Sequence, residues 1–198
     1  MFRHLQRLQT LLIPLLLGFV SETAATTVVR FPFDSLCVRA ERIAHVRCLR
    51  TQSFRDAQGG GIFTQTVFEV LNPIKGDSVS KEIVLTLPGG RVEGQRLLVP
   101  GMPEFSPHQE SVLFLTGSSG TDSPWPVGLS QGWYEVLVEN QDEPQVVLQA
   151  GETPMPDGSL FKPSSHRPFT VLLDDFLTQI RSNLSALDLP PGSDHFPR

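Results

Sequence analysis

Short segments of alternating apolar and polar residues, each ended by proline or glycine, limit the folds that are open to this chain. Such alternation indicates β-strands with one buried face, and the chain's 17 prolines and 16 glycines supply frequent turns. The absence of helical patterns between these segments predicts an antiparallel barrel or a sandwich rather than a parallel sheet. The expected strands are residues 43–51, 62–71, 82–87, 91–99, 111–116, 132–139 and 145–149.

Three details refine this prediction. Gly94 lies inside the fourth segment and indicates a β-bulge there. The nearly continuous apolar segment at 111–116 is expected to be a central strand, and the last two segments are expected to form a hairpin around residues 140–143. Residues 33–40 are compatible with one helical turn, capped by Asp34 or Ser35.

The hydrophobic period changes near the C-terminus. Apolar residues there recur at helical spacing, and Thr170 can cap the helix start. We therefore expect an amphipathic helix over residues 169–185, after a Pro/Gly/Ser-rich connection at 151–168 and before a flexible tail at 186–198. The apolar positions are Leu172, Leu173, Phe176, Leu177, Ile180 and Leu184.

The N-terminus has the pattern of an export signal. Arg3 and Arg7 precede an apolar run at residues 11–20, and small residues follow it. Thr23 and Ala25 suit the two pockets of a signal peptidase, so cleavage is expected after Ala25. An apolar run of this length covers about half of a bilayer core as a helix, which favours cleavage over anchoring. The sequence predicts a secreted or periplasmic protein whose β domain spans residues 26–150.

The charge of the chain limits its partners. Cleavage removes two basic residues and one acidic residue, which changes the formal net charge from −5 to −6. A broad nucleic-acid surface needs clustered positive charge, so we expect no nucleic-acid partner. The mature chain also gives no reason to expect membrane attachment after cleavage.

Two cysteines, Cys37 and Cys48, enter an oxidising compartment if the chain is exported. A disulfide between them requires the chain to fold back near residues 41–42, because an extended strand would hold them too far apart. The alternative is a pair of buried free thiols. No neighbouring histidine pair completes a metal site, and we expect neither a metal nor another cofactor.

Several motifs resemble a group of small exported bacterial proteins. They are residues 63–71, Lys75-Gly76, residues 83–87 with Pro88-Gly89-Gly90, Pro103-Glu104-Phe105 with residues 110–115, residues 127–132, and Asp175-Phe176-Leu177. The resemblance covers residues 35–183. It implies a fold and no particular activity.

The order strand, loop, Thr-rich strand, Lys-Gly turn and strand is also similar to the netrin-like domain of tissue inhibitors of metalloproteinases. This resemblance implies a closed or partly open OB-type barrel. Those inhibitors chelate the protease zinc through an N-terminal Cys-x-Cys motif, whereas Val38-Arg39 follow Cys37 here. The inhibitory mechanism is therefore not transferred to any residue.

A zinc-protease motif is not apparent. There is no His-Glu-x-x-His, and Ser106 with His108 is only a local pair. The aromatic residues Trp125, Trp133 and Tyr134 lie close together in sequence and form either part of the core or a binding face.

Three functions follow from these features. The first is an exported, non-enzymatic domain that binds an unknown protein partner. The second is an inhibitor or accessory of an exported metalloprotease. The third is an enzyme whose catalytic residues come together from distant strands.

Overall fold

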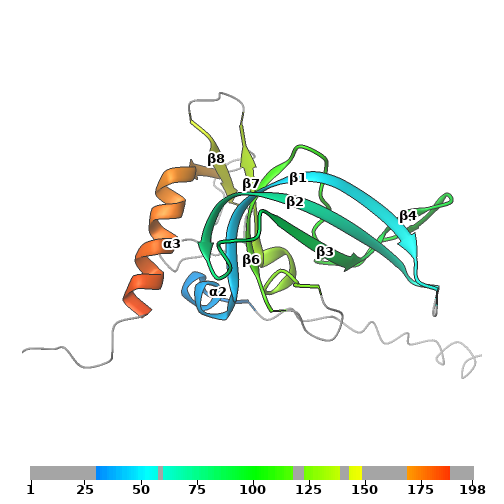
Figure 1. The fold of residues 1–198 in the computed structure, drawn as a ribbon, viewed down its shortest axis with the longest axis horizontal. Coiled ribbons are helices and arrows are strands. Elements are labelled where there is room, and N and C mark those ends of the chain that lie inside the picture. The colour runs from blue at the N-terminus through cyan, green and yellow to red at the C-terminus, as the bar shows by residue number, and fades with distance from the viewer. Residues whose placement is uncertain (1–29, 58–59, 118–122, 139–142, 149–168, 188–198) are drawn as a thin grey trace, which may run out of the picture.

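A curved seven-stranded antiparallel sheet is the framework of the molecule (Figure 1). The computed structural model describes residues 30–57, 60–117, 123–138, 143–148 and 169–187. The expected export signal, the 151–168 connection and residues 188–198 lie outside this part. The sheet has the order β3-β2-β1-β6-β7-β8-β9, so β6 is its central strand, as expected. Its strands are β1 Arg42–Arg55, β2 Ile62–Lys75, β3 Glu82–Pro88, β6 Glu110–Leu115, β7 Trp133–Leu137, β8 Gln145–Leu148 and β9 Phe169–Leu172.

Two helices lie on one face of the sheet. The short helix α2 (Phe33–Arg39) and the C-terminal helix α3 (Leu173–Leu187) contact each other and share one hydrophobic core with the sheet. Phe33 is at the centre of this core, where its ring meets Tyr134 and Phe176 edge-on. The C-terminal helix predicted from the 3.6-residue period is therefore present.

A second core lies on the opposite face. Alternation along β1 places Ile43 in the helix-side core, whereas Ala44, Val46 and Cys48 enter the second core. Instead of a helix, this face is covered by the half-buried side chains of Met102, Phe105, Trp125 and Trp133. The sheet is thus buried on both faces near its centre.

The sheet is open, which corrects the expectation of a closed barrel. Closure requires hydrogen bonds between the two outermost strands, and in the described residues β3 and β9 each have one strand neighbour. The outer edge of β3 is instead met by Ser123, whose hydroxyl accepts a hydrogen bond from the Thr86 N–H at 2.8 Å. At the other edge, β9 continues directly into α3. The two outer strands therefore do not meet, and the sheet does not close in the described residues.

Two further segments differ from the sequence-based expectation. Residues 91–99 do not form one bulged strand, because β4 (Gly90–Val92) and β5 (Gln95–Leu97) make a small separate ribbon. Glu93 and Gly94, both with positive φ, form the turn between them. The C-terminal helix begins at Leu173, since Thr170 pairs with Val147 in the sheet instead of capping the helix.

A connecting 3-10 helix, η1 (Leu129–Gly132), leads into β7. Helix α2 follows Pro32 and receives no side-chain cap from Asp34 or Ser35. Within the described residues, no helix is long and apolar enough to cross a membrane.

Candidate functional site

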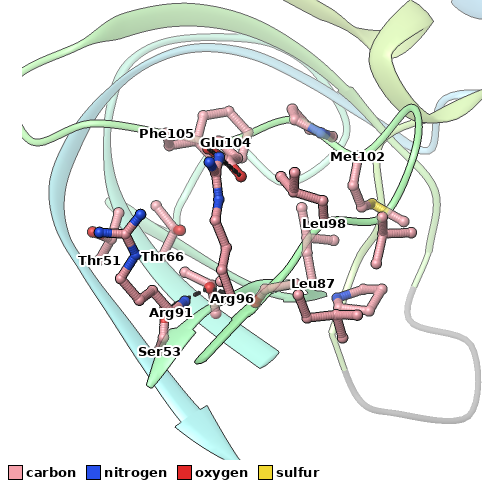
Figure 2. Close-up of a pocket in the computed structure, with 17 residues that line it drawn as sticks. Thr51, Ser53, Thr66, Leu87, Arg91, Arg96, Leu98, Met102, Glu104 and Phe105 are labelled. Atoms are coloured by element: carbon pink, nitrogen blue, oxygen red, sulfur yellow. Dashed lines mark hydrogen bonds and ion pairs between the residues drawn. The ribbon is translucent and has the colours of Figure 1, made fainter. Parts of the chain in front are cut away.

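A cleft of about 570 Å³ lies on the face of the sheet opposite the helices (Figure 2). Its floor is the outer part of the β1–β2 hairpin, beyond the point where β6 stops pairing with β1. The end of β3, the β4–β5 ribbon and residues 98–105 form its walls. Small-ligand sites in proteins have volumes of about 300–1,000 Å³, so the cleft is large enough to hold a ligand.

A β-bulge in β1 determines which side chains face the cleft. Cys48 pairs with Phe68 and Arg50 pairs with Val67, so Leu49 is an extra residue in β1. Such an insertion reverses which side chains face each side of the sheet. As a result Thr51 and Ser53 line the cleft, and Arg50 does not.

Two glycines let the ribbon cross over the hairpin. Gly89 and Gly90 have φ values of +115° and +126°, which L-residues with side chains rarely adopt. A Cβ atom on Gly90 would overlap the hydroxyl oxygens of Ser53 and Thr64. The sequence Pro88-Gly89-Gly90 therefore brings the backbone into direct contact with the floor.

The hydroxyl groups of the floor bind the ribbon. Ser53 Oγ lies 2.9 Å from Thr64 Oγ1, and it also accepts a hydrogen bond from the Arg91 N–H at 3.3 Å. Thr64 Oγ1 donates to the Gly89 carbonyl at 2.8 Å. These bonds hold the ribbon over the hairpin, so the walls of the cleft are preformed.

Two arginines from the ribbon project into the cleft. In Figure 2, Arg91 lies beside Thr51 and Thr66, whereas Arg96 extends toward Glu104 and Phe105. Arg96 forms an ion pair with Glu104 at 3.2 Å. In the part of the chain that the structure describes, the Arg91 guanidinium has neither a hydrogen-bond nor an ion-pair partner.

The remaining wall is apolar. Leu87, Leu98, Met102 and Phe105 line it together with parts of the ribbon. Phe105 lies edge-on to Phe68 at 4.9 Å and to Trp133 at 5.8 Å between ring centroids. The cleft is therefore continuous with the second core through the ring of Phe105.

The structure separates the three aromatic residues considered as a binding face. Tyr134 is 1% exposed in the helix-side core. Trp125 and Trp133 are half-buried against the second core, and the Trp133 indole N–H donates to Ser111 Oγ at 3.0 Å. Alternation along β7 places Trp133 and Tyr134 on opposite faces. Trp133 reaches the cleft wall through its contact with Phe105.

The two cysteines are not bonded to each other. Cys37 on α2 lies in the helix-side core and Cys48 on β1 lies in the second core. The chain does fold back between them, at residues 40–41, but the fold-back places the two thiols on opposite faces of the sheet. Of the two alternatives left open by the sequence, the disulfide is not formed, and two buried free thiols are what the structure has.

A polar cluster on β1 and β6 is the second notable arrangement. His45 is 8% exposed, and its Nε2 lies 2.9 Å from Glu110 Oε2. Arg47 donates to the other oxygen of Glu110 from Nη2 at 2.8 Å and contacts Glu69 at 3.4 Å. Burial lowers the pKa of His45 despite the opposing effect of Glu110. A neutral His45 donating its Nε2–H to Glu110 fits this geometry.

This polar cluster and the cleft are separate. His45 and Glu110 do not line the cleft, whose lining includes one carboxylate, that of Glu104, and no histidine. Among the described residues, no three His, Cys, Asp or Glu side chains come together as a metal site would require. The chemistry available in the cleft is therefore hydrogen bonding, apolar contact and positive charge.

Only part of this site can be recognised from the sequence. Pro88-Gly89-Gly90 indicates a sharp turn, but neither that turn nor the bulge at Leu49 reveals that the ribbon crosses the hairpin. No protein-family model, curated protein sequence or solved structure matches this chain. The fold and the cleft define it as a β-sheet domain with helices on one face and a preformed cleft of ligand size on the other.

Proposed function

We propose that the mature chain is an exported, non-enzymatic binding domain whose ligand occupies the cleft. The observation that carries this proposal is the cleft itself, about 570 Å³ between the β1–β2 hairpin and the crossing ribbon. Its walls are fixed by the hydrogen bonds of Ser53 and Thr64 and do not need to form around a ligand. Preformed walls reduce the entropy cost of binding.

Export is part of the same proposal. It is supported by the basic start, apolar run and small-residue exit of residues 1–25. The mature chain then begins at Thr26 and is released into the periplasm or the medium. A ligand would reach the cleft there without crossing a further membrane.

We also propose that this domain is related to netrin-like or OB-type domains. It is supported by the strongly curved antiparallel sheet and the motif order along β1, β2 and β3. A role as an inhibitor of an exported metalloprotease would need a mechanism other than chelation of zinc by a cysteine, because Cys37 and Cys48 are both buried. A binding role for the cleft has no such requirement.

The test uses a matched pair of substitutions in β1. Thr51→Trp places a large side chain in the floor of the cleft, whereas Gln52→Trp places it at the exposed neighbouring position that does not line the cleft. The mature protein and both variants are compared by thermal shift against a library of metabolites, lipids and peptides. We expect compounds that stabilise the wild type and Gln52→Trp to lose their effect on Thr51→Trp. Compounds that stabilise all three proteins equally would refute the assignment of the cleft.

Export is tested separately by N-terminal sequencing. The full-length chain is produced in its source organism, and the protein in the extracytoplasmic fraction is sequenced. We expect Thr26 as the first residue. Retention of residues 1–25 in a cytoplasmic product would refute export without affecting the cleft.

A further inference from the structure

The charge inside the cleft is unbalanced. Arg96 is neutralised by Glu104 at 3.2 Å, but Arg91 has no ionic partner among the described residues. The lining therefore carries one excess positive charge, in a chain whose overall formal charge is −5. A guanidinium binds carboxylate and phosphate groups through parallel hydrogen bonds. The geometry favours a ligand with one anionic group.

The hydroxyl groups do not favour a sugar. Ser53 and Thr64 already bond to each other and to the ribbon backbone, and Thr66 is only 2% exposed. Among these described floor residues, Thr51 is the one whose hydroxyl is both outside these hydrogen bonds and on a partly exposed residue. A carbohydrate needs many hydrogen-bond partners that are still free, and the floor provides few of them.

The walls favour an apolar chain. Leu98 is 60% exposed and Leu97 is 38% exposed, and both residues line the cleft. Met102 and Phe105 continue this apolar surface toward the second core. An apolar ligand in the cleft would remove these side chains from water, which is favourable in proportion to the area covered.

We propose that the cleft binds a monomeric, single-chain amphipathic anion. Its carboxylate, sulfate or phosphate group binds Arg91, and its apolar chain lies along Leu98, Met102 and Phe105. This inference rests on the proposed function, because it names the class of ligand for the same cleft. A free amphiphile is favoured over a membrane surface, since Arg91 lies within the cleft beside the hydroxyl floor (Figure 2).

The first experiment compares head groups on one chain length. Binding of dodecanoate, dodecyl maltoside and dodecylammonium to the mature protein is measured by isothermal titration calorimetry, below the concentrations at which they form micelles. A charge-assisted hydrogen bond contributes about 1.5–3 kcal/mol. We therefore expect dodecanoate to bind about ten- to a hundredfold more tightly than dodecyl maltoside, and dodecylammonium more weakly still.

Two substitutions change the charge in opposite directions. Arg91→Gln should weaken dodecanoate binding about ten- to a hundredfold and leave dodecyl maltoside unchanged. Glu104→Gln releases Arg96 and should strengthen dodecanoate binding. Arg50→Gln is the matched control, because Arg50 is exposed on β1 and does not line the cleft. Circular dichroism verifies that each variant is folded.

The outcomes separate this inference from the proposed function. Equal affinity for the three head groups, or an Arg91→Gln variant that binds dodecanoate as the wild type does, would overturn the inference. Binding to phosphatidylglycerol vesicles without binding of dodecanoate would overturn it too. In each case the comparison of Thr51→Trp with Gln52→Trp would still decide whether the cleft binds another class of ligand.

Discussion

Cys37 and Cys48 lie in different hydrophobic cores, on opposite faces of the seven-stranded sheet. Both side chains are 0% exposed. A disulfide requires the two Cα atoms to lie about 4.4–6.8 Å apart with their Cβ atoms facing each other. With β1 between the helix-side core and the second core, the native fold does not allow this approach. The two thiols serve as small apolar core residues.

We expect both thiols to be reduced and unreactive in the folded protein. Burial raises the pKa of Cys37 to about 11 and also raises the pKa of Cys48, so little reactive thiolate forms at neutral pH. Intact-mass analysis after maleimide treatment without a reductant should show no adduct in buffer and two adducts in denaturant. Leu49→Cys, at a position that is 40% exposed, is the positive control for native labelling. A protein that stays unlabelled in denaturant would indicate a disulfide and contradict this prediction.

Protonation of His45 is expected to destabilise the fold. Burial lowers the pKa of His45 in the folded protein below the ordinary value of about 6.5 that applies after unfolding, although Glu110 opposes this shift. The unfolded state therefore binds a proton more readily, and the free energy of unfolding falls as the pH decreases through about 6.5. Urea denaturation at pH 7.5, 6.5 and 5.5 measures this change.

The variant His45→Gln separates this effect from other titrations. Glutamine can still donate a hydrogen bond to Glu110 but does not titrate, so the dependence of stability on pH should become flatter. His108→Gln is the control, because His108 is exposed in the loop before β6. If His45→Gln and the wild type showed the same dependence on pH, His45 would not be the responsible group.

Local sequence patterns predicted most of the strands and the C-terminal helix. β3 alternates between apolar and polar residues and β6 is apolar, because burial follows a regular pattern along each strand. Such a pattern can be recognised from the sequence alone. Thr170 shows the limit of such patterns. It has the chemistry of a helix cap, but pairing with Val147 in the sheet makes it part of β9. Thr170 is compatible with either a helix cap or a strand, and its pairing with Val147 determines that it lies in a strand.

The candidate site was less predictable, because long-range contacts create it. The extra residue Leu49 can be recognised only from the pairing of β1 with β2. Glu93-Gly94 forms a turn with two positive φ values, for which asparagine or aspartate before glycine is the usual signal. Glutamate does not give this signal, so residues 91–99 resembled a single strand. The bulge at Leu49 and the turn at Glu93-Gly94 together place Arg91 beside Thr51 (Figure 2).

Lys75 is expected to stabilise the attachment of α2 to the sheet. Its Nζ donates to the carbonyls of Cys37 at 2.8 Å and Val38 at 3.2 Å, at the C-terminal end of α2. A cation at this end is favourable because it balances the helix dipole and the unpaired carbonyls. Lys75→Met should lower the free energy of unfolding by about 1 kcal/mol, as measured by urea denaturation.

Lys81→Met is the matched control for this prediction. Lys81 is exposed just before β3, and its side chain has no hydrogen-bond partner among the described residues. We expect a change of less than about 0.5 kcal/mol there. Equal effects of the two substitutions would mean that the contacts of Lys75 contribute nothing beyond its charge.

Gly90 should be required for the cleft, and Gly94 serves as its control within the same ribbon. Both residues have positive φ, so alanine strains the backbone at either position. A Cβ on Gly94 meets no atom within 4 Å, whereas a Cβ on Gly90 overlaps the hydroxyls of Ser53 and Thr64. Gly94→Ala should therefore lower the free energy of unfolding by about 1 kcal/mol. Gly90→Ala should lower it by about 3 kcal/mol, because steric overlap adds to the strain.

The two contributions at Gly90 can be separated with a second substitution. Ser53→Gly removes one of the groups that the new Cβ would meet but does not relieve the backbone strain. Ser53→Gly should therefore lower the free energy of unfolding less in the Gly90→Ala background than in the wild type, as a double-mutant cycle measures. Strict additivity, or equal losses for Gly90→Ala and Gly94→Ala, would contradict the direct contact between ribbon and hairpin. Because this contact fixes the position of Arg91, Gly90→Ala should also weaken dodecanoate binding, whereas Gly94→Ala should not.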